Sequence, residues 1–220
     1  IFLAAASAVL TTFVSCEREY LETDPTHAVS DATAYSTTAN LTTVINGMHR
    51  NMYYRQNESQ GQNGATGVMI FMEVLGEDLI FPATGTTWYV STIRWLDNAN
   101  ANSSNLFYPY DFYYGQIRIA NEVINNAQAA TGEQADKDRL MGEAYVFRAF
   151  SYTMLTQIYG KRFVPGTANS QLGVPIRLDA TFNPIPRATV DENYAQINAD
   201  LAKAFTLLSG KTRSNKSHFN

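Results

Sequence analysis

Apolar residues recur at helical spacing over most of the chain. The most regular stretch lies between residues 140 and 160. One row of apolar or small residues there advances in steps of three or four: Leu140, Ala144, Phe147, Ser151, Leu155 and Ile158. A second row covers another face: Met141, Tyr145, Phe150, Tyr152, Met154 and Tyr159. Because two faces are apolar, we expect this helix to be packed between neighbours, with Gly160 ending it in the left-handed conformation.

Three other segments carry the same periodicity and are predicted to be helices. They run over residues 41–52, 113–127 and 189–208, and their apolar residues repeat every three or four positions. Thr189 and Glu192 have the spacing of a capping box at the start of the last segment, and Gly210 is placed to end it. The continuous apolar run at 68–75 favours a short buried helix.

The predicted helices indicate a mainly α fold of tetratricopeptide-like pairs with long irregular loops. Segments 113–128 and 140–159 are expected to form an antiparallel hairpin, in which the small residues Ala120, Ala144 and Ala149 allow close approach. The repeat of about 34 residues that a regular tetratricopeptide array would show is absent. Residues 161–188 are rich in Pro and Gly and predict a long connection folded over the surface.

The first residues have the character of an export signal. Residues 1–15 are apolar or small and carry no charge. They are fewer than the roughly 20 residues that span a bilayer, and their length fits the hydrophobic part of a signal that begins upstream. Cys16, the only cysteine, follows directly. We therefore divide the chain into a signal (1–16), an extended tether (17–30) and a helical domain (31–220).

Charge and composition exclude several classes of site. The net charge is −4, only 16% of residues are charged, and the longest basic run is Lys161–Arg162, so no nucleic-acid surface is predicted. One cysteine permits neither an internal disulfide nor a four-thiolate zinc site. His27, His49 and His218 lie far apart in sequence. We therefore predict no metal, no cofactor and no catalytic residue.

The residues between 84 and 105 are the candidate ligand-binding region. Both tryptophans of the chain fall there among Thr, Ser and Asn. Sugar rings stack on indole and phenol rings, and their hydroxyl groups suit Asn and Arg. The candidate ligand-binding residues are Trp88, Tyr89, Arg94, Trp95 and Asn98. In the alternative interpretation, the two tryptophans only anchor a long loop to the core.

Four blocks of sequence, taken in order, resemble the SusD/RagB family. They are Gly142-Glu-Ala-Tyr-Val-Phe-Arg-Ala-Phe-Ser-Tyr, Leu155-Thr-Gln-Ile-Tyr-Gly, Gly173-Val-Pro-Ile and Pro186-Arg-Ala-Thr-Val-Asp-Glu-Asn-Tyr. The family consists of outer-membrane lipoproteins that capture nutrients, mostly glycans. The resemblance implies a non-catalytic protein that passes oligosaccharides to a SusC-like TonB-dependent transporter, and a chain that holds only the N-terminal portion of the fold.

The resemblance also implies a lipid anchor and a place at the cell exterior. Phe13-Val-Ser-Cys16 is similar to a lipobox, in which the cysteine becomes acylated, although Phe13 replaces the usual Leu. Acidic residues after that cysteine, here Glu17 and Glu19, accompany surface display in the family. The alternative for Cys16 is a free thiol near the end of a cleavable signal.

Three other functions stay open at this point. The first is a peptide-binding RagB-like protein. The second is a fragment of a secreted glycoside hydrolase, for which Asp97 is the nearest carboxylate to the tryptophans. The third is a helical interaction scaffold without a small ligand.

Overall fold

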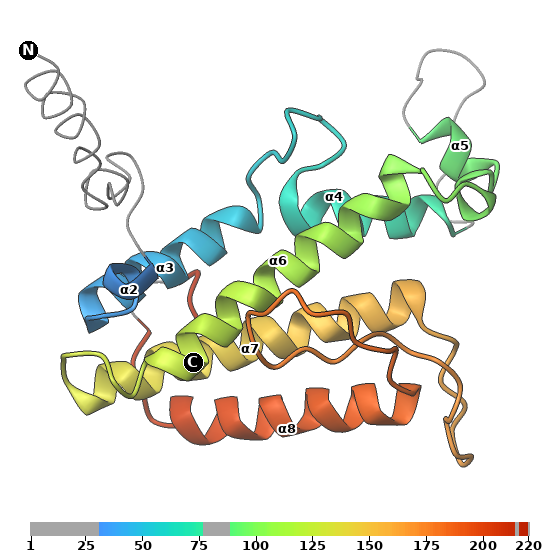
Figure 1. The fold of residues 1–220 in the computed structure, drawn as a ribbon. Helices are drawn as coiled ribbons and strands as arrows, with labels where there is room; N and C mark the ends of the chain where they lie inside the picture. The colour runs from blue at the N-terminus through green and yellow to red at the C-terminus, as the bar shows by residue number, and fades with distance from the viewer. Residues whose placement is uncertain (1–30, 77–88, 214–215, 220) are drawn as a thin grey trace, which may run out of the picture.

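The computed structural model describes residues 31–76, 89–213 and 216–219, and this part of the chain is helical without a β-strand (Figure 1). The helices are α2 (Asp31–Ala34), α3 (Thr38–Asn51), α4 (Gly64–Val74), α5 (Val90–Ile93), a 3-10 turn (Asp97–Ala99), α6 (Ser104–Asn126), α7 (Gln134–Tyr159) and α8 (Val190–Leu208). The predicted mainly α fold is therefore confirmed. The predicted signal, the tether, Cys16 and Trp88 lie outside the described residues.

Three long helices form the body of the molecule. Helix α7 lies between α6 and α8, and successive helices run in opposite directions (Figure 1). Helix α3 packs against both α6 and α7. The described helices pack through two apolar clusters, one around Tyr113, Tyr152 and Leu155 and one around Leu41 and Phe147. Since α7 contributes to both clusters, the prediction that two of its faces are buried is confirmed.

Small residues set the spacing between the helices. Ala120, Ala144 and Ala149 are buried, as the predicted α6–α7 hairpin requires. Gly142 has the same role on the other side of α7. A Cβ atom added at Gly142 would lie 2.7 Å from Cγ of Leu208 in α8. Helices α7 and α8 therefore approach too closely at this point for any side chain larger than hydrogen.

The ends of the helices confirm some predictions and correct others. The capping box is present: Thr189 Oγ1 accepts from the Glu192 backbone N–H at 3.2 Å, and Glu192 Oε2 accepts from the Thr189 N–H at 2.7 Å. The prediction for Gly160 is wrong, because its φ of −81° and ψ of 164° are extended. Helix α6 begins before Pro109, since the Ser103 hydroxyl caps it by accepting from the Leu106 N–H.

A buried ion pair joins the three long helices. Arg148 of α7 donates to both carboxylate oxygens of Asp200 in α8, at 2.8 and 2.6 Å. Its remaining terminal nitrogen donates to Asn121 Oδ1 of α6 at 2.8 Å. Gln196 donates a further hydrogen bond to Asp200. This network places a charged cluster inside the helix layers, where every charge is paired.

Buried polar side chains hold the connection between α7 and α8 (residues 160–189) against the helices. Asn121 donates to the backbone carbonyls of residues 177 and 179, and the Tyr152 hydroxyl contacts the backbone of residue 177 at 2.7 Å. Asn193 bonds both backbone groups of Val174. The long connection is thus fixed over the surface, as the sequence predicted.

A helix that crosses a membrane must be both long and apolar. Among the described helices, none combines the length and apolar character that crossing a membrane requires.

Candidate functional site

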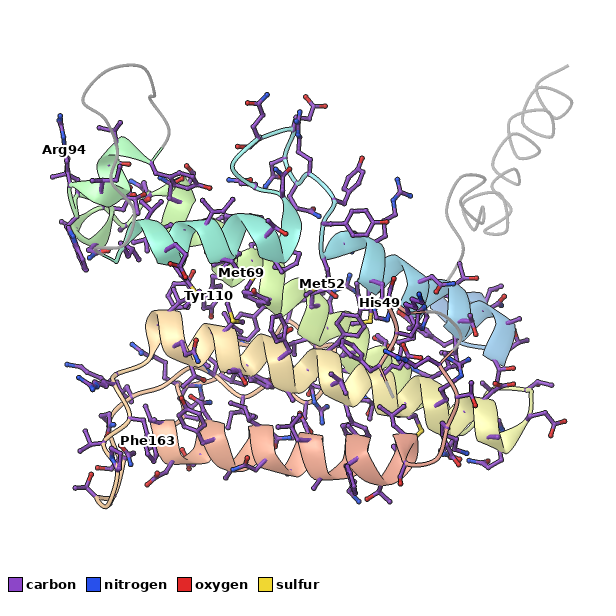
Figure 2. The ribbon with its side chains drawn as sticks, turned by 180° about the vertical axis from the view of Figure 1, so that it is seen from behind. His49, Met52, Met69, Arg94, Tyr110 and Phe163 are labelled. Atoms are coloured by element: carbon purple, nitrogen blue, oxygen red, sulfur yellow. The ribbon has the colours of Figure 1, made fainter. Side chains whose placement is uncertain are left out.

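The described members of the predicted ligand-binding set gather around α5 and the 3-10 turn. Arg94 and Asn98 are exposed to solvent, and 59% of the Trp95 surface is accessible. Tyr89 is half-buried and donates its hydroxyl to the Gly61 carbonyl at 3.0 Å, and burial raises the pKa of that hydroxyl. Arg94 projects away from the helices at the outer edge of the molecule (Figure 2). Three of the predicted residues are thus presented to solvent, while Tyr89 fastens the segment.

Trp95 does not anchor a loop to the core. Besides being largely exposed, it has a φ of 56°, in the left-handed region. Bulky residues rarely adopt this conformation, and they keep it only where the surroundings enforce it. Tyr89 shares the feature with a φ of 55°. The backbone on both sides of α5 is therefore strained, and surrounding contacts must hold this segment in place.

Those contacts centre on Asp97. Its carboxylate accepts hydrogen bonds from Ser91, Thr92 and Ser103 at 3.2, 2.5 and 2.8 Å, and from the Asn105 amide at 3.2 Å. Burial alone would raise the pKa of Asp97, but the four donors outweigh burial and lower it. Asp97 therefore stays ionised and saturated with donors, and it serves to hold the turn that carries Trp95. We name Tyr89, Arg94, Trp95, Asn98 and the Asp97 network the Trp95 platform.

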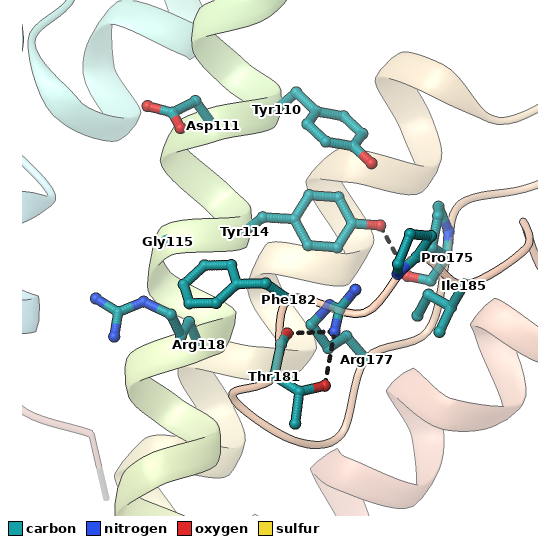
Figure 3. A pocket seen from close by; sticks show the side chains of 11 residues that line it. Tyr110, Asp111, Tyr114, Gly115, Arg118, Pro175, Arg177, Thr181, Phe182 and Ile185 are labelled. Atoms are coloured by element: carbon teal, nitrogen blue, oxygen red, sulfur yellow. Dashed lines mark hydrogen bonds between the residues drawn. The ribbon is translucent and has the colours of Figure 1, made fainter.

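A separate, concave feature, the α6 pocket, lies between α6 and residues 175–185 (Figure 3). Its volume is about 410 Å³, within the usual range of ligand pockets of about 300–1,000 Å³. Tyr110 and Tyr114 lie next to each other along one wall, with ring centroids 4.5 Å apart and ring planes tilted by 43°. Phe182 is exposed on the opposite side. The main lining residues are Tyr110, Asp111, Tyr114, Arg118, Arg177 and Phe182.

The walls of the α6 pocket are fixed by hydrogen bonds rather than by apolar packing alone. The Tyr114 hydroxyl donates to the Pro175 carbonyl at 2.7 Å, and burial raises its pKa so that it remains a donor. The Arg177 guanidinium donates to backbone and side-chain oxygens of Thr181 and to the Asn183 carbonyl. Aromatic faces with charged groups at the edge suit a ligand that has apolar ring faces and hydroxyl groups.

The sequence did not predict the α6 pocket. Periodicity predicts a helix over 113–127, which includes Tyr114 but not Tyr110, and residues 161–188 are predicted only as a connection folded over the surface. The two parts are brought together by Asn121, Tyr152 and Tyr114, which bond a backbone more than 20 positions away. Helical periodicity carries no signal for such contacts. The cluster of tyrosines at residues 108–114 was the available clue.

Comparison with known proteins shows which family this chain is similar to. A SusD-like family model described as "starch-binding associating with outer membrane" matches residues 19–220. This match confirms the resemblance that the sequence blocks suggested. A comparison with curated proteins finds no match.

Solved structures from Bacteroides share the fold. A SusD-like carbohydrate binding protein from Bacteroides vulgatus is 23% identical with a TM-score of 0.70, covering 82% of this chain and 38% of its own. A putative sugar binding protein from the same species is 22% identical with a TM-score of 0.69, covering 84% and 40%. A SusD superfamily protein from Bacteroides thetaiotaomicron is 21% identical with a TM-score of 0.59, covering 78% and 37%.

The chain thus spans about two fifths of the length of these structures. With the family model covering nearly the whole chain and the helical body shared with these proteins, the chain belongs to the SusD-like family of starch-binding proteins that associate with the outer membrane.

Proposed function

We propose that this protein is a surface lipoprotein of the outer membrane that binds neutral oligosaccharides and passes them to a SusC-like TonB-dependent transporter. Cys16 would carry the lipid anchor, and the Trp95 platform would supply the first contact with the sugar. The observation that carries the proposal is the exposed indole of Trp95, which stands on the segment that the Asp97 network holds. A rigid aromatic ring with only two side-chain torsions loses little conformational entropy when a sugar ring stacks on it.

The neighbouring polar groups support a sugar rather than an apolar ligand. Arg94 and Asn98 flank Trp95 in sequence and are both exposed. Together they offer guanidinium and amide donors beside an apolar ring face, which is the combination that recognises hydroxyl groups on a ring. Arg94 also brings a positive charge, so an acidic sugar would be a better ligand than a cationic one.

The names of the structural relatives favour a glycan over a peptide. Two of them are described as a carbohydrate binding and a sugar binding protein. Their identity to this chain is 23% and 22%, so they show the fold, and the ligand class is carried to this chain as part of the proposal. A peptide ligand, as in the RagB-like alternative, remains the competing outcome of the binding test below.

The hydrolase alternative is less well supported. Glycosidases place two carboxyl groups on either side of the scissile bond. Asp97 is buried and saturated by donors. In the α6 pocket, Asp111 is the one carboxylate among the described lining residues. Neither surface therefore offers a pair of accessible carboxyl groups within the described ranges.

Affinity electrophoresis tests the proposal. The purified protein is run through native gels that contain starch or another neutral polysaccharide, with a control gel lacking the polysaccharide. We expect retarded migration in at least one polysaccharide gel, relief by the matching soluble oligosaccharide and no release of reducing sugar. Relief by peptides alone would support the peptide-binding alternative, and released reducing sugar would support the hydrolase. Unretarded migration in every gel would favour the scaffold.

A further inference from the structure

Three side chains from distant parts of the chain converge at one point inside the protein. His49 lies in α3, Glu143 in α7 and His218 in the segment that follows α8. One ligating atom from each side chain lies within 4.8 Å of the others. Glu143 is fully buried and His218 is 4% exposed. His49 sits on the side of α3 that faces α7 (Figure 2).

The Glu143 carboxylate divides its two oxygens between different partners. Oε1 accepts from the Arg139 guanidinium at 2.8 Å, which fixes the orientation of the carboxylate. Oε2 faces both imidazoles, with His49 Nε2 at 3.0 Å and His218 Nδ1 at 2.8 Å. One oxygen and two ring nitrogens thus point into a common space on the side away from Arg139.

The contact between His218 and Glu143 is short, but its geometry is not that of a hydrogen bond. Nδ1 lies at ion-pair distance from Oε2, 2.8 Å, but the contact is poorly oriented for a hydrogen bond, and this buried nitrogen has no other hydrogen-bonding partner among the described residues. Leaving a buried polar atom without a partner is costly, and such atoms in native proteins call for an explanation. A cation bound between the three atoms would satisfy this nitrogen.

We propose that His49, Glu143 and His218 bind a divalent transition-metal ion of the zinc type. Zinc binds imidazole nitrogen and carboxylate oxygen at about 2.0–2.2 Å, so neighbouring ligand atoms of a tetrahedral site lie about 3.3 Å apart. The two nitrogen–oxygen separations, 3.0 and 2.8 Å, are shorter than this value, and all three ligand atoms lie within 4.8 Å of one another, so small rotations of the side chains would bring them around one ion. Two imidazoles with one carboxylate favour Zn²⁺ over Ca²⁺ or Mg²⁺, which prefer oxygen ligands.

In this proposal the ion has a structural role, and a water molecule would be the fourth ligand that a tetrahedral zinc site requires. The His49 ring packs against Phe147 at 4.8 Å and Phe219 at 5.3 Å, so aromatic rings cover the site. Arg139 would act as the partner that holds the ligating carboxylate in place. Because the ligands come from α3, α7 and the segment after α8, the ion would fasten that segment to the helix pair. Sequence spacing predicted no such site, since 94 positions separate His49 from Glu143.

Calorimetry with Zn²⁺ tests the proposal. The full chain is used with Cys16→Ser, which removes the only thiol, and is first dialysed against EDTA. We expect saturable binding of Zn²⁺ at one ion per chain, no saturable binding of Ca²⁺, and a higher Tm with Zn²⁺ than with EDTA. Absence of a saturable Zn²⁺ isotherm would overturn the proposal.

Substitutions of the histidines locate the bound ion. His49→Gln and His218→Gln should each weaken Zn²⁺ binding by about tenfold or more. His27→Gln is the matched control. Because His27 is not one of the proposed ligands, this variant should bind Zn²⁺ within about twofold of the parent's affinity. Circular dichroism checks that each variant is folded, and since His49 is partly exposed, His49→Gln decides the matter if His218→Gln does not fold. Unchanged affinity in His49→Gln, or equal losses in His27→Gln, would contradict the assignment.

Discussion

Arg148 and Asp200 face each other in a part of the structure from which water is almost excluded. Their side chains are 6% and 2% exposed, and two hydrogen bonds join them. A buried ion pair adds little net stability compared with an apolar pair of the same size, but removing one partner leaves a buried charge without compensation. The pair therefore fixes how α7 and α8 fit together more than it strengthens the fold.

Replacing Arg148 alone should destabilise the protein strongly. We expect Arg148→Met to lower the free energy of unfolding by about 3–5 kcal/mol, because Asp200 would stay buried without its cation. Equilibrium unfolding in urea measures the change. The double variant Arg148→Met, Asp200→Leu should recover part of the loss.

A surface ion pair provides the control for this prediction. Lys211 and Asp138 lie 3.9 Å apart, and their side chains are 31% and 28% exposed. Lys211→Ala should therefore cost less than about 1 kcal/mol. Equal losses in Arg148→Met and Lys211→Ala would show that the buried pair has no special role.

Single residues are also where prediction from sequence was weakest. Helical periodicity assigns apolar positions to the core, so it passed over Arg148 and Asp200, both of which are buried. Each is buried only because its partner lies on another element, a fact that local sequence does not contain. The same limit applied to His49 and His218, whose convergence on Glu143 depends on the packing of three separate segments.

At the scale of whole elements, α7 and α8 approach each other closely at Gly142. We expect Gly142→Ala to destabilise the protein by about 1–3 kcal/mol, because the added methyl group would overlap Leu208 and push the helices apart. The better helix propensity of Ala offsets only about 1 kcal/mol of that cost. Thermal or urea unfolding measures the result.

Gly47 in α3 is the matched control for Gly142. It also lies inside a helix, but an added Cβ would meet no atom within 4 Å. Gly47→Ala should therefore raise stability by about 0.5–1 kcal/mol through helix propensity alone. If Gly142→Ala raises stability as Gly47→Ala does, then the close approach of α7 and α8 does not exclude a larger side chain at residue 142.

The helices themselves were largely predictable, and their ends less so. The apolar rows located α3, α6, α7 and α8, and the Thr189–Glu192 spacing located the start of α8. The apolar row placed the start of α6 near residue 113, yet the helix begins at Ser104 and accommodates Pro109 in its second turn. Gly160 ends α7 in an extended conformation because the chain continues directly into the pinned connection.

At the scale of the whole molecule, the proposed lipid anchor determines where the protein works. Cys16 lies outside the described residues, ahead of the 19–220 region that the family model matches. A lipid anchor there would leave the helical domain free at the membrane surface. Several acyl chains on one cysteine would hold durably, since a single chain binds a membrane only marginally.

Replacing the cysteine tests this arrangement directly. When the protein is made in the cells that naturally produce it, Cys16→Ala should move it from the membrane fraction to the soluble fraction, without changing its circular dichroism. Ser15→Ala keeps a small residue before the cysteine and should leave fractionation unchanged. Retention of Cys16→Ala in the membrane fraction would reject the anchor.

For the proposed ligand-binding surface, the sequence indicated the residue types to expect between 84 and 105 but gave no sign of the α6 pocket. Residue types between 84 and 105 pointed to an aromatic and polar surface, and the structure exposes Trp95, Arg94 and Asn98 there. The α6 pocket escaped prediction because its two walls are separated by some 60 positions and meet through bonds such as Tyr114 to Pro175. The central claim, that the sugar binds at Trp95, can therefore be tested by comparing substitutions in the Trp95 platform with substitutions in the α6 pocket.

The measurement that tests this claim most directly is the affinity of the Trp95→Ala and Leu96→Ala variants for the same oligosaccharide. Both residues are similarly exposed, at 59% and 57%, so each substitution removes an apolar surface side chain at little cost to the fold. If the indole of Trp95 stacks on the sugar, Trp95→Ala should weaken binding by about tenfold, or about 1.4 kcal/mol, while Leu96→Ala binds like the parent. Equal affinities for Trp95→Ala and the parent, with loss on Phe182→Ala instead, would contradict the claim and place the ligand in the α6 pocket.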